Sequence, residues 1–194
     1  EAEKAWLAGH PVLRVGIDAS WAPIEFADAR GVAQGIAPAT VREMEKRLGI
    51  RIETVILPSW SEALAQLADG RVDLLPSLDV SRKDRGDLRL TEPYVSFPAV
   101  IFSDAEVAYL GNLDAVKDEL VAVVEGDIVA DSIREVSPTQ RLLPVANTRE
   151  ALRRVAAGEA FAFVGNPVTT SYYIVQTGLT QIRVAGETPF TYRL

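Results

Sequence analysis

The sequence has 194 residues, which is enough for one large domain or for two small lobes with separate cores. Hydrophobic residues make up 48% of it, so a packed globular fold is expected. The net charge of −7 excludes bulk electrostatic binding to nucleic acid or to an anionic membrane surface. Without cysteine the chain has no disulfide, thiolate or cysteine metal site, and the lone histidine, His10, lacks a second ligand. We therefore predict neither a metal nor a cofactor, and no apolar run approaches the ~18 residues of a membrane-spanning helix.

The first part of the chain alternates between strand and helix patterns. A Ser-Trp-Ser-Glu sequence starting at Ser59 matches a capping box, in which the first serine caps a helix and the glutamate follows three residues later. The expected elements are a helix over 1–9, a strand over 12–17, a loop over 18–26, a helix over 37–48, a strand over 51–57, a helix ending at residue 68 and a short strand over 72–75.

The stretch 70–94 is the one that points to a binding site. After the strand over 72–75 it continues with a polar turn over 77–81 and a charged single helical turn that carries Arg82 and Arg85. Pro93 then favours an extended segment. Ligands of open α/β sheets bind at the carboxyl edge of the strands, and the planar guanidinium of arginine can hold a carboxylate by two parallel hydrogen bonds.

The second part of the chain repeats the alternation. The expected elements are a strand over 97–102, an undecided stretch over 104–119, a strand over 120–124, a helix over 127–136, a strand over 142–145, a helix capped by Thr148 and stopped by Gly158, a strand over 161–164, a helix started by Asn166-Pro167 and ended by Gly178, and strands over 181–185 and 190–193. Regular alternation of strands and helices predicts the α/β class with largely parallel sheets.

Two segments of the chain echo each other. Residues 61–75 and 149–163 both read as a helix, a glycine stop and a strand that leads into a polar loop, with Glu62 corresponding to Glu150. Two related α/β lobes would explain this pattern, and a cleft between lobes is a preferred ligand site.

The motifs together resemble the bacterial family 3 solute-binding proteins. The matching residues are the Gly-Ile-Asp of 16–18 with Trp-Ala-Pro-Ile-Glu-Phe over 21–26, Gly-Ile at 35–36, the Gly-x-Val-Asp-Leu-Leu-Pro of 70–76, Arg85, Thr-Glu-Pro-Tyr over 91–94, and the segment 158–166. The opening residues 3–11 and the Asp-Leu-Leu-Pro variant are most similar to the Venus-flytrap sensor domains of hybrid histidine kinases of the BvgS type.

The resemblance implies a two-lobed periplasmic binding protein of type II. Lobe 1 would span residues 1–95 with 189–194 returning to it, and lobe 2 would span 96–188. The segments 93–97 and 188–191 would form a two-stranded hinge. The C-terminal helices with which family members complete lobe 1 are expected to lie outside this sequence.

The resemblance also implies a set of ligand-binding residues. Arg85 takes the place of the family's carboxylate-binding arginine, with Arg82 as a second candidate. The other residues that the resemblance places at the ligand are Asp18, Trp21, Phe26, Ser77, Leu78, Asp79, Asp127 and Asn166.

Lobe 2 departs from the pattern of amino-acid binders at two of these positions. Asp127 stands where the family often has a threonine that holds the ligand carboxylate, and Asn166 stands where amino-acid binders place an aspartate for the α-ammonium group. These changes argue against an ordinary α-amino acid and leave a small carboxylate, another polar organic molecule, or signalling without a ligand.

Three functions remain open at this point. The first is a periplasmic sensor domain of a membrane histidine kinase, attached to the membrane by segments outside this sequence and homodimeric in the full receptor. The second is a free solute-binding protein of an ABC transporter. The third, least favoured, is an enzyme on the same fold, for which Asp18, Asp79 and Asp127 are the available acids and bases but lack a spacing that signals chemistry.

Overall fold

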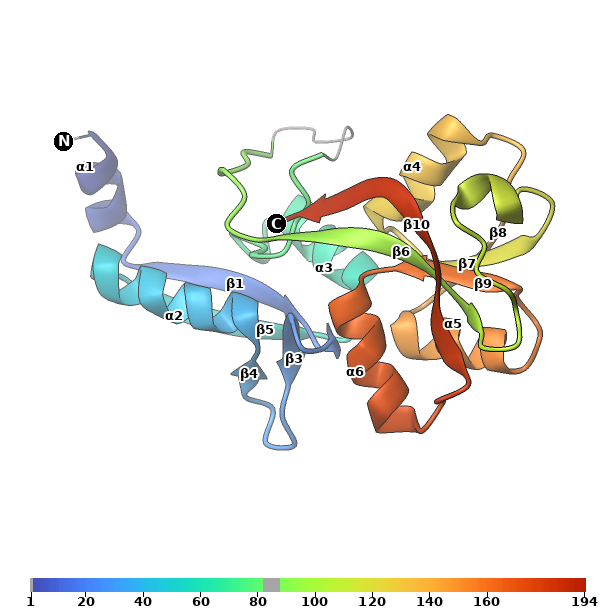
Figure 1. The fold of residues 1–194 in the computed structure, drawn as a ribbon. Coiled ribbons are helices and arrows are strands. Elements are labelled where there is room, and N and C mark those ends of the chain that lie inside the picture. Colours follow the sequence, from blue (N-terminus) through green and yellow to red (C-terminus); the bar gives the residue numbers. More distant parts are fainter. Residues whose placement is uncertain (1, 82–87) are drawn as a thin grey trace. The chain divides into compact units, whose positions relative to one another are not determined.

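The computed structural model describes residues 2–81 and 88–194, and the chain divides into two compact units, Glu1–Leu78 (unit 1) and Asp79–Leu194 (unit 2) (Figure 1). The predicted helical turn with Arg82 and Arg85 lies outside the described residues. The lobe boundaries predicted at residues 95 and 188 stay a prediction.

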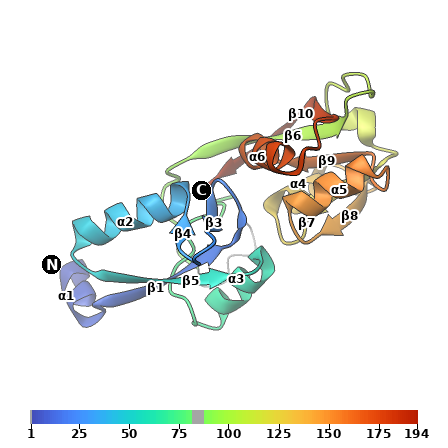
Figure 2. The ribbon, with the colours of Figure 1, turned by 90° about the horizontal axis from the view of Figure 1, so that it is seen from below.

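Unit 1 is built on two parallel strands, β1 (Val12–Asp18) and β5 (Arg51–Leu57), which pair along their whole length. The helices α2 (Ile36–Leu48) and α3 (Trp60–Ala68) cover opposite faces of this pair (Figure 2). The crossover through α2 leads from β1 to β5, and the one through α3 leads back to the other side of β1. Crossovers between parallel strands are right-handed as a rule, and with that hand this reversal of direction puts the two helices on opposite faces.

Local sequence signals set the ends of these helices. Ser59 caps α3 by accepting a hydrogen bond from the backbone N–H of Glu62 at 3.3 Å, which confirms the serine cap of the predicted capping box. Gly49 ends α2 in the left-handed conformation, with φ of 65°, as its place after the last apolar residue predicts. The helix at the N-terminus, α1 (Ala2–Gly9), is also present where it was expected.

The segment after β1 differs from the prediction of a loop over 18–26. It forms a small antiparallel sheet of three strands, β2 (Ser20–Trp21), β3 (Glu25–Ala27) and β4 (Ala33–Gln34). Strands of two or three residues are too short to show alternation in a sequence, so tertiary pairing decides them.

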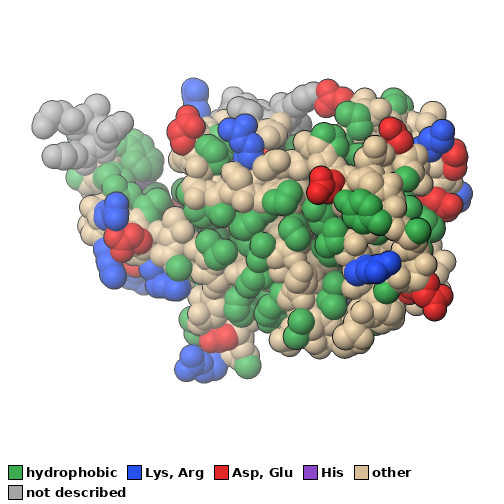
Figure 3. Space-filling view, in the orientation of Figure 1, with side chains coloured by type: hydrophobic (Ala, Val, Ile, Leu, Met, Phe, Trp, Pro, Cys, Tyr) green, Lys and Arg blue, Asp and Glu red, His purple; other side chains and the backbone are tan. Residues whose placement is uncertain are grey.

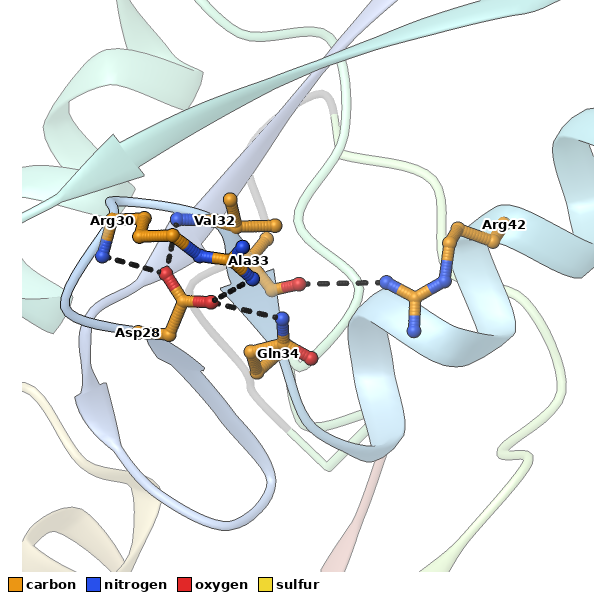
Figure 4. Close-up of polar contacts among 6 residues, drawn as sticks. All are labelled: Asp28, Arg30, Val32, Ala33, Gln34 and Arg42. Carbon is orange, nitrogen blue, oxygen red and sulfur yellow. Dashed lines mark hydrogen bonds and ion pairs between the residues drawn. The ribbon is translucent and has the colours of Figure 1, made fainter.

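One glycine and one aspartate shape this small sheet and its connection to α2. Gly35 has a φ of 115°, and a β-carbon there would lie 2.4 Å from the carbonyl oxygen of Ile24, so the backbone approaches as closely as it does because the residue is glycine. Asp28 closes the turn between β3 and β4 by accepting from the backbone N–H groups of Arg30 and Val32 at 2.9 and 3.0 Å (Figure 4).

The predicted strand over 72–75 is wrong in extent. Leu74 alone forms a bridge to Val15, and the backbone N–H of Gly16 donates to the carbonyl of Leu74 at 3.0 Å. Val72 and Leu75 are buried in the core beside Leu57 and Ala63. The apolar residues over 72–75 are therefore apolar because they are buried. The backbone of this segment makes too few hydrogen bonds to a neighbouring strand to count as a strand.

Unit 2 contains a five-stranded sheet in the order β10-β6-β9-β7-β8. Its strands are β6 (Ser96–Asp104), β7 (Leu120–Val124), β8 (Arg141–Val145), β9 (Ala162–Gly165) and β10 (Ile182–Arg193). β7 is parallel to β8 and β9, whereas β6 is antiparallel to β9 and β10. The sheet is therefore mixed, which corrects the expectation of largely parallel sheets.

β10 corrects a second expectation, because it is one long strand where two were predicted. Its pairing with β6 shifts register between Val184 and Gly186 and again between Glu187 and Thr191. The polar and proline residues around the second shift broke the apolar pattern in the sequence, but the backbone continues through them.

The helices of unit 2 lie on both faces of its sheet. α5 (Thr148–Ala156) and α6 (Pro167–Thr177) cover one face and α4 (Ile128–Val136) covers the other (Figures 1 and 2). Asn147, not Thr148, caps α5 by accepting from the N–H of Glu150 at 3.0 Å, so the predicted cap was one residue late. A short 3-10 helix, η1 (Leu113–Val116), lies within the stretch that the sequence left undecided.

Candidate functional site

Asp18 closes β1 and is the first of the predicted site residues. It is 4% exposed, and its Oδ1 accepts hydrogen bonds from the backbone N–H and the hydroxyl of Ser20, at 2.8 and 2.7 Å. Burial raises the pKa of Asp18 above its ordinary value, and the two bonds from Ser20 oppose that rise. The carboxyl end of β1 thus presents a buried acid at the edge where α/β sheets bind ligands.

Glu25, in β3, is a site residue that the sequence analysis missed. It is 1% exposed; its Oε2 accepts a hydrogen bond from the hydroxyl of Ser77 at 2.9 Å, and its Oε1 accepts from the N–H of Asp18 at 3.2 Å. Burial raises the pKa of Glu25 to about 8, and the charge of Asp18 adds to the rise. A charged residue between apolar neighbours, in Pro-Ile-Glu-Phe, was the signal that could have found it.

The structure brings Asp18 and Ser77 together through Glu25. Ser77 is 2% exposed and follows the bridge at Leu74, so its segment runs beside the end of β1. Leu78 is half-buried and packs on the cluster of Leu57 and its neighbours, which adds a packing role to its predicted one.

The two predicted aromatic residues lie on the hairpin next to this cluster. Trp21 pairs with Glu25 across the β2–β3 ladder, and Phe26 pairs with Ser20. Both side chains are half-buried. The pairing places them on the same small sheet as the buried acid.

In unit 2, Asp79 connects two backbone segments. It is 6% exposed, its Oδ1 accepts from the N–H of Ser81 at 2.7 Å, and its Oδ2 accepts from the N–H of Arg193 at 2.6 Å. Both carboxylate oxygens therefore accept hydrogen bonds from backbone N–H groups, and the second bond connects the end of β10 to the start of unit 2.

Asp127 caps α4 with one oxygen and receives a hydroxyl on the other. Its Oδ1 accepts from the N–H of Val129 at 2.9 Å, and its Oδ2 accepts from the hydroxyl of Tyr192 at 3.0 Å. Burial raises the pKa of Asp127 to about 6, although both bonds favour the ionised form. The cap lies at the start of the helix predicted over 127–136, and the bond to Tyr192 was not foreseen.

Asn166 caps α6 and leaves a buried donor group without a partner. It is 3% exposed, and its Oδ1 accepts from the N–H groups of Val168 and Thr169 at 2.8 and 3.4 Å. Among the described residues, neither its Nδ2 nor the buried Oγ1 of Thr169 has a hydrogen-bond partner. Because such groups are rare in folded proteins, they mark a position that a polar atom of a ligand or a water would satisfy.

A pocket of about 270 Å³ also opens within unit 2, beside α4 and β10. Its lining consists of Ser81, Ile128, Val129, Ser132, Pro189, Phe190, Thr191 and Arg193. None of the predicted site residues within the described ranges lines it.

Over residues 2–81 and 88–194, no cluster of acidic and histidine side chains is arranged to hold a metal ion. In that same part of the chain, no helix has the length and apolar character needed to cross a membrane. Arg85 lies outside it, so its predicted role in binding stays a prediction.

Two α/β units with helices on both faces and polar residues at strand ends define the periplasmic binding protein fold. The family profile of the bacterial extracellular solute-binding proteins, family 3, matches residues 13–187, and the chain belongs to this family.

Relatives among characterised proteins are sensor kinases. The chain is 26% identical over 183 residues to the virulence sensor protein BvgS of Bordetella pertussis, and 22% identical over 174 residues to the sensor protein EvgS of Escherichia coli K12. These alignments cover 94% and 90% of this chain but 15% and 14% of the relatives. The chain is thus homologous to a sensor segment and spans about one seventh of each relative.

Solved structures agree with this assignment. A histidine kinase sensor domain with similarity to periplasmic binding proteins superposes with a TM-score of 0.88 at 25% identity, covering 94% of this chain and 79% of that one. The VFT2 domain of B. pertussis BvgS, as a double mutant, superposes with a TM-score of 0.84 at 26% identity over 100% of this chain and 82% of that one. An ancestral arginine-binding protein, at 20% identity and a TM-score of 0.80, shares the fold.

Proposed function

We propose that this chain is the extracytoplasmic ligand-sensing domain of a membrane-bound hybrid histidine kinase. The observation that carries the proposal is homology to sensor kinases over 94% of the chain. The domain itself is not an enzyme in this proposal, and the kinase activity belongs to parts of the protein outside this sequence. A ligand would signal by shifting the population of conformations, which it can do only through a difference in affinity between them.

The proposed ligand is a small organic molecule with a hydrogen-bond acceptor, a carboxylate being the leading candidate. Arg85 would bind the carboxylate, with Arg82 as the alternative, while Ser77 and Asn166 would supply further polar contacts. The unpartnered Nδ2 of Asn166 supports an acceptor there, because an amide N–H donates and an ammonium group would meet no acceptor on that atom. Trp21 and Phe26 would pack against the body of the ligand.

A thermal-shift screen of small acids, amino acids and amines tests this proposal, because a ligand that binds the native state raises Tm. We expect an acid to raise Tm in the wild type, and Arg85→Ala to abolish the shift. A shift that persists in Arg85→Ala refutes the assignment of Arg85. If no compound raises Tm, the ligand-binding function fails.

For the oligomeric state we propose a homodimer in the full receptor, in contact through the exposed side of α6. Residues 160–182 carry no charged side chain, and Figure 3 shows hydrophobic side chains with few charged ones over α6 and β10. Val168 and Val175 on α6 are 37% and 76% exposed. Depletion of charge marks the centre of interfaces, and two copies of a chain with a net charge of −7 repel least through an uncharged surface.

Sedimentation of the full periplasmic part tests this contact. We expect Val175→Glu to shift the protein toward monomer, and Val136→Glu, at an exposed valine of α4 on the other face of the sheet, serves as a control for the added negative charge. A dimer that is equally stable in Val175→Glu places the interface elsewhere.

A further inference from the structure

Glu25 is a fully buried acid that lacks a counter-ion in the described part of the chain. No lysine or arginine among the described residues forms an ion pair with it. The one titratable group facing it from the described elements is Asp18 at the end of β1, which is itself an acid. The neighbours from β2 and from the segment before Leu78 are Ser20, Trp21 and Ser77, none of which carries a charge.

The two oxygens of Glu25 contact two segments that present predicted ligand-binding residues. Oε1 accepts the backbone N–H of Asp18 at 3.2 Å, and Oε2 contacts the hydroxyl of Ser77 at 2.9 Å. Asp18, Glu25 and Ser77 are each at most 4% exposed, so water does not compete effectively for these bonds. One carboxyl group therefore joins both segments by hydrogen bonds.

The proton on Glu25 controls what Ser77 can do. A serine hydroxyl has one hydrogen to donate and two lone pairs to accept with. When Glu25 is ionised, both of its oxygens are acceptors, so the hydrogen of Ser77 is committed to Oε2. When Glu25 is protonated on Oε2, that O–H can donate to Oγ of Ser77, and the hydrogen of Ser77 becomes available to another acceptor.

We propose that Glu25 is a positioning residue whose proton decides whether Ser77 can donate a hydrogen bond to an anionic ligand. This inference rests on the proposed function, because it requires an acceptor ligand at Ser77. When such a ligand binds the ionised form, one proton is taken up onto Glu25, and the bound ligand in turn makes that proton harder to remove. No bond other than hydrogen bonds forms or breaks.

The pH range of this coupling follows from the burial of the group. Burial holds the pKa of Glu25 at about 8, so the protonated, binding-competent form dominates at pH 7 and becomes the minority at pH 9. Because apparent affinity scales with the competent fraction, affinity for an acid should be about tenfold weaker at pH 9 than at pH 7. A cationic ligand would show the opposite sign, since it would favour ionised Glu25.

The isosteric variant Glu25→Gln tests the inference directly. Its amide oxygen can accept from Asp18 and its NH₂ can donate to Ser77, so it reproduces the protonated acid at every pH. Calorimetric titration would use acetate, lactate, succinate and glutamate as probes at pH 7 and pH 9. We expect the wild type to lose about tenfold in affinity over this range and Glu25→Gln to vary less than twofold.

Glu53→Gln is the matched control, because Glu53 is an exposed glutamate on β5 of the same unit. It should retain the pH dependence of the wild type, whereas Ser77→Ala should lose both the dependence and part of the affinity at pH 7. A purely structural role of Glu25 would change Tm in Glu25→Gln but leave the pH profile of binding intact.

The outcomes separate this inference from the proposed function. If no probe binds at either pH, the acidic-ligand function fails. If a probe binds the wild type equally at both pH values, or if Glu25→Gln keeps the pH dependence, the function stands and the role of Glu25 is wrong. Independently of any ligand, the ¹³C signal of the Glu25 carboxyl should titrate with a midpoint near 8 in the wild type, and a midpoint below 6 overturns the proposal.

Discussion

Each unit contains an acid that receives one backbone N–H and one hydroxyl. Glu25 is fully buried and Asp127 is half-buried, and the two acids differ in how readily they ionise. Glu25 accepts from Asp18 at 3.2 Å and from Ser77, and its pKa is about 8. Asp127 accepts from Val129 at 2.9 Å and from Tyr192, and its pKa is about 6.

The difference in pKa follows first from burial, because Glu25 is 1% exposed whereas Asp127 is half-buried. Asp127 caps α4, so its carboxylate also lies at the positive end of a helix, which favours the ionised form. Glu25 meets a single backbone N–H at the end of a strand. Neighbouring negative charges raise both pKa values, Asp18 acting on Glu25, and Asp79 and Asp131 acting on Asp127. The same chemical group therefore serves as a fixed structural anion in unit 2 and as a proton-carrying group in unit 1.

The largest expected difference between the two acids lies in the pH dependence of the free energy of unfolding. The folded chain keeps a proton on Glu25 that the unfolded chain, with an ordinary pKa of 4.5, releases. This contribution is complete below pH 4.5 and is lost as pH rises through 8, so the wild type should lose about 2–3 kcal/mol between pH 6 and pH 9 from this group. In urea unfolding, Glu25→Gln should not show this fall in the free energy of unfolding between pH 6 and pH 9. If the free energies of unfolding of the wild type and Glu25→Gln changed in parallel with pH, Glu25 would ionise with its ordinary pKa.

A second effect concerns the anchoring role of Asp127. Asp127→Ala removes the cap of α4 and the acceptor for Tyr192, so we expect a loss of about 1–2 kcal/mol in the free energy of unfolding at pH 7. Asp127→Asn keeps an oxygen that can cap α4 and should be less damaging. Asp114→Ala, which removes a side chain inside η1 rather than at its cap Asn112, provides a milder comparison. Equal stability of Asp127→Ala and wild type would contradict the anchoring role.

A smaller effect isolates the unpartnered polar groups at α6. Thr169→Val replaces a buried hydroxyl that has no partner among the described residues, so we expect stability to rise by about 1 kcal/mol in the absence of ligand. Thr170→Val is the matched control, because Thr170 is equally buried but donates to the carbonyl of Asn166 at 2.7 Å. That variant should lose about 1 kcal/mol. Equal changes in the two variants would show that Thr169 finds a partner in solution.

Much of the fold could be read from short-range signals. The strand Arg51–Leu57, the cap at Ser59 and the start of α6 at Asn166-Pro167 lie where the sequence placed them, because apolar periodicity and capping chemistry act within a few residues. The family assignment, too, rested on motifs in order along the chain. The antiparallel pairing of β6 with β9 and β10 could not be read in this way, since strand direction depends on partners far away in sequence.

The candidate site also combines features that the sequence predicted with features that depend on long-range contacts. The motifs along the sequence carried the resemblance to the family, and the resemblance named Asp18, Ser77, Asp127 and Asn166. Tertiary structure alone decided what those residues contact: it brought Glu25 beneath Asp18 and Ser77, and it set Tyr192 against Asp127. The physical reason is that burial and hydrogen bonding across 52 or 65 residues of sequence depend on how segments pack, and packing carries no local signature in the chain.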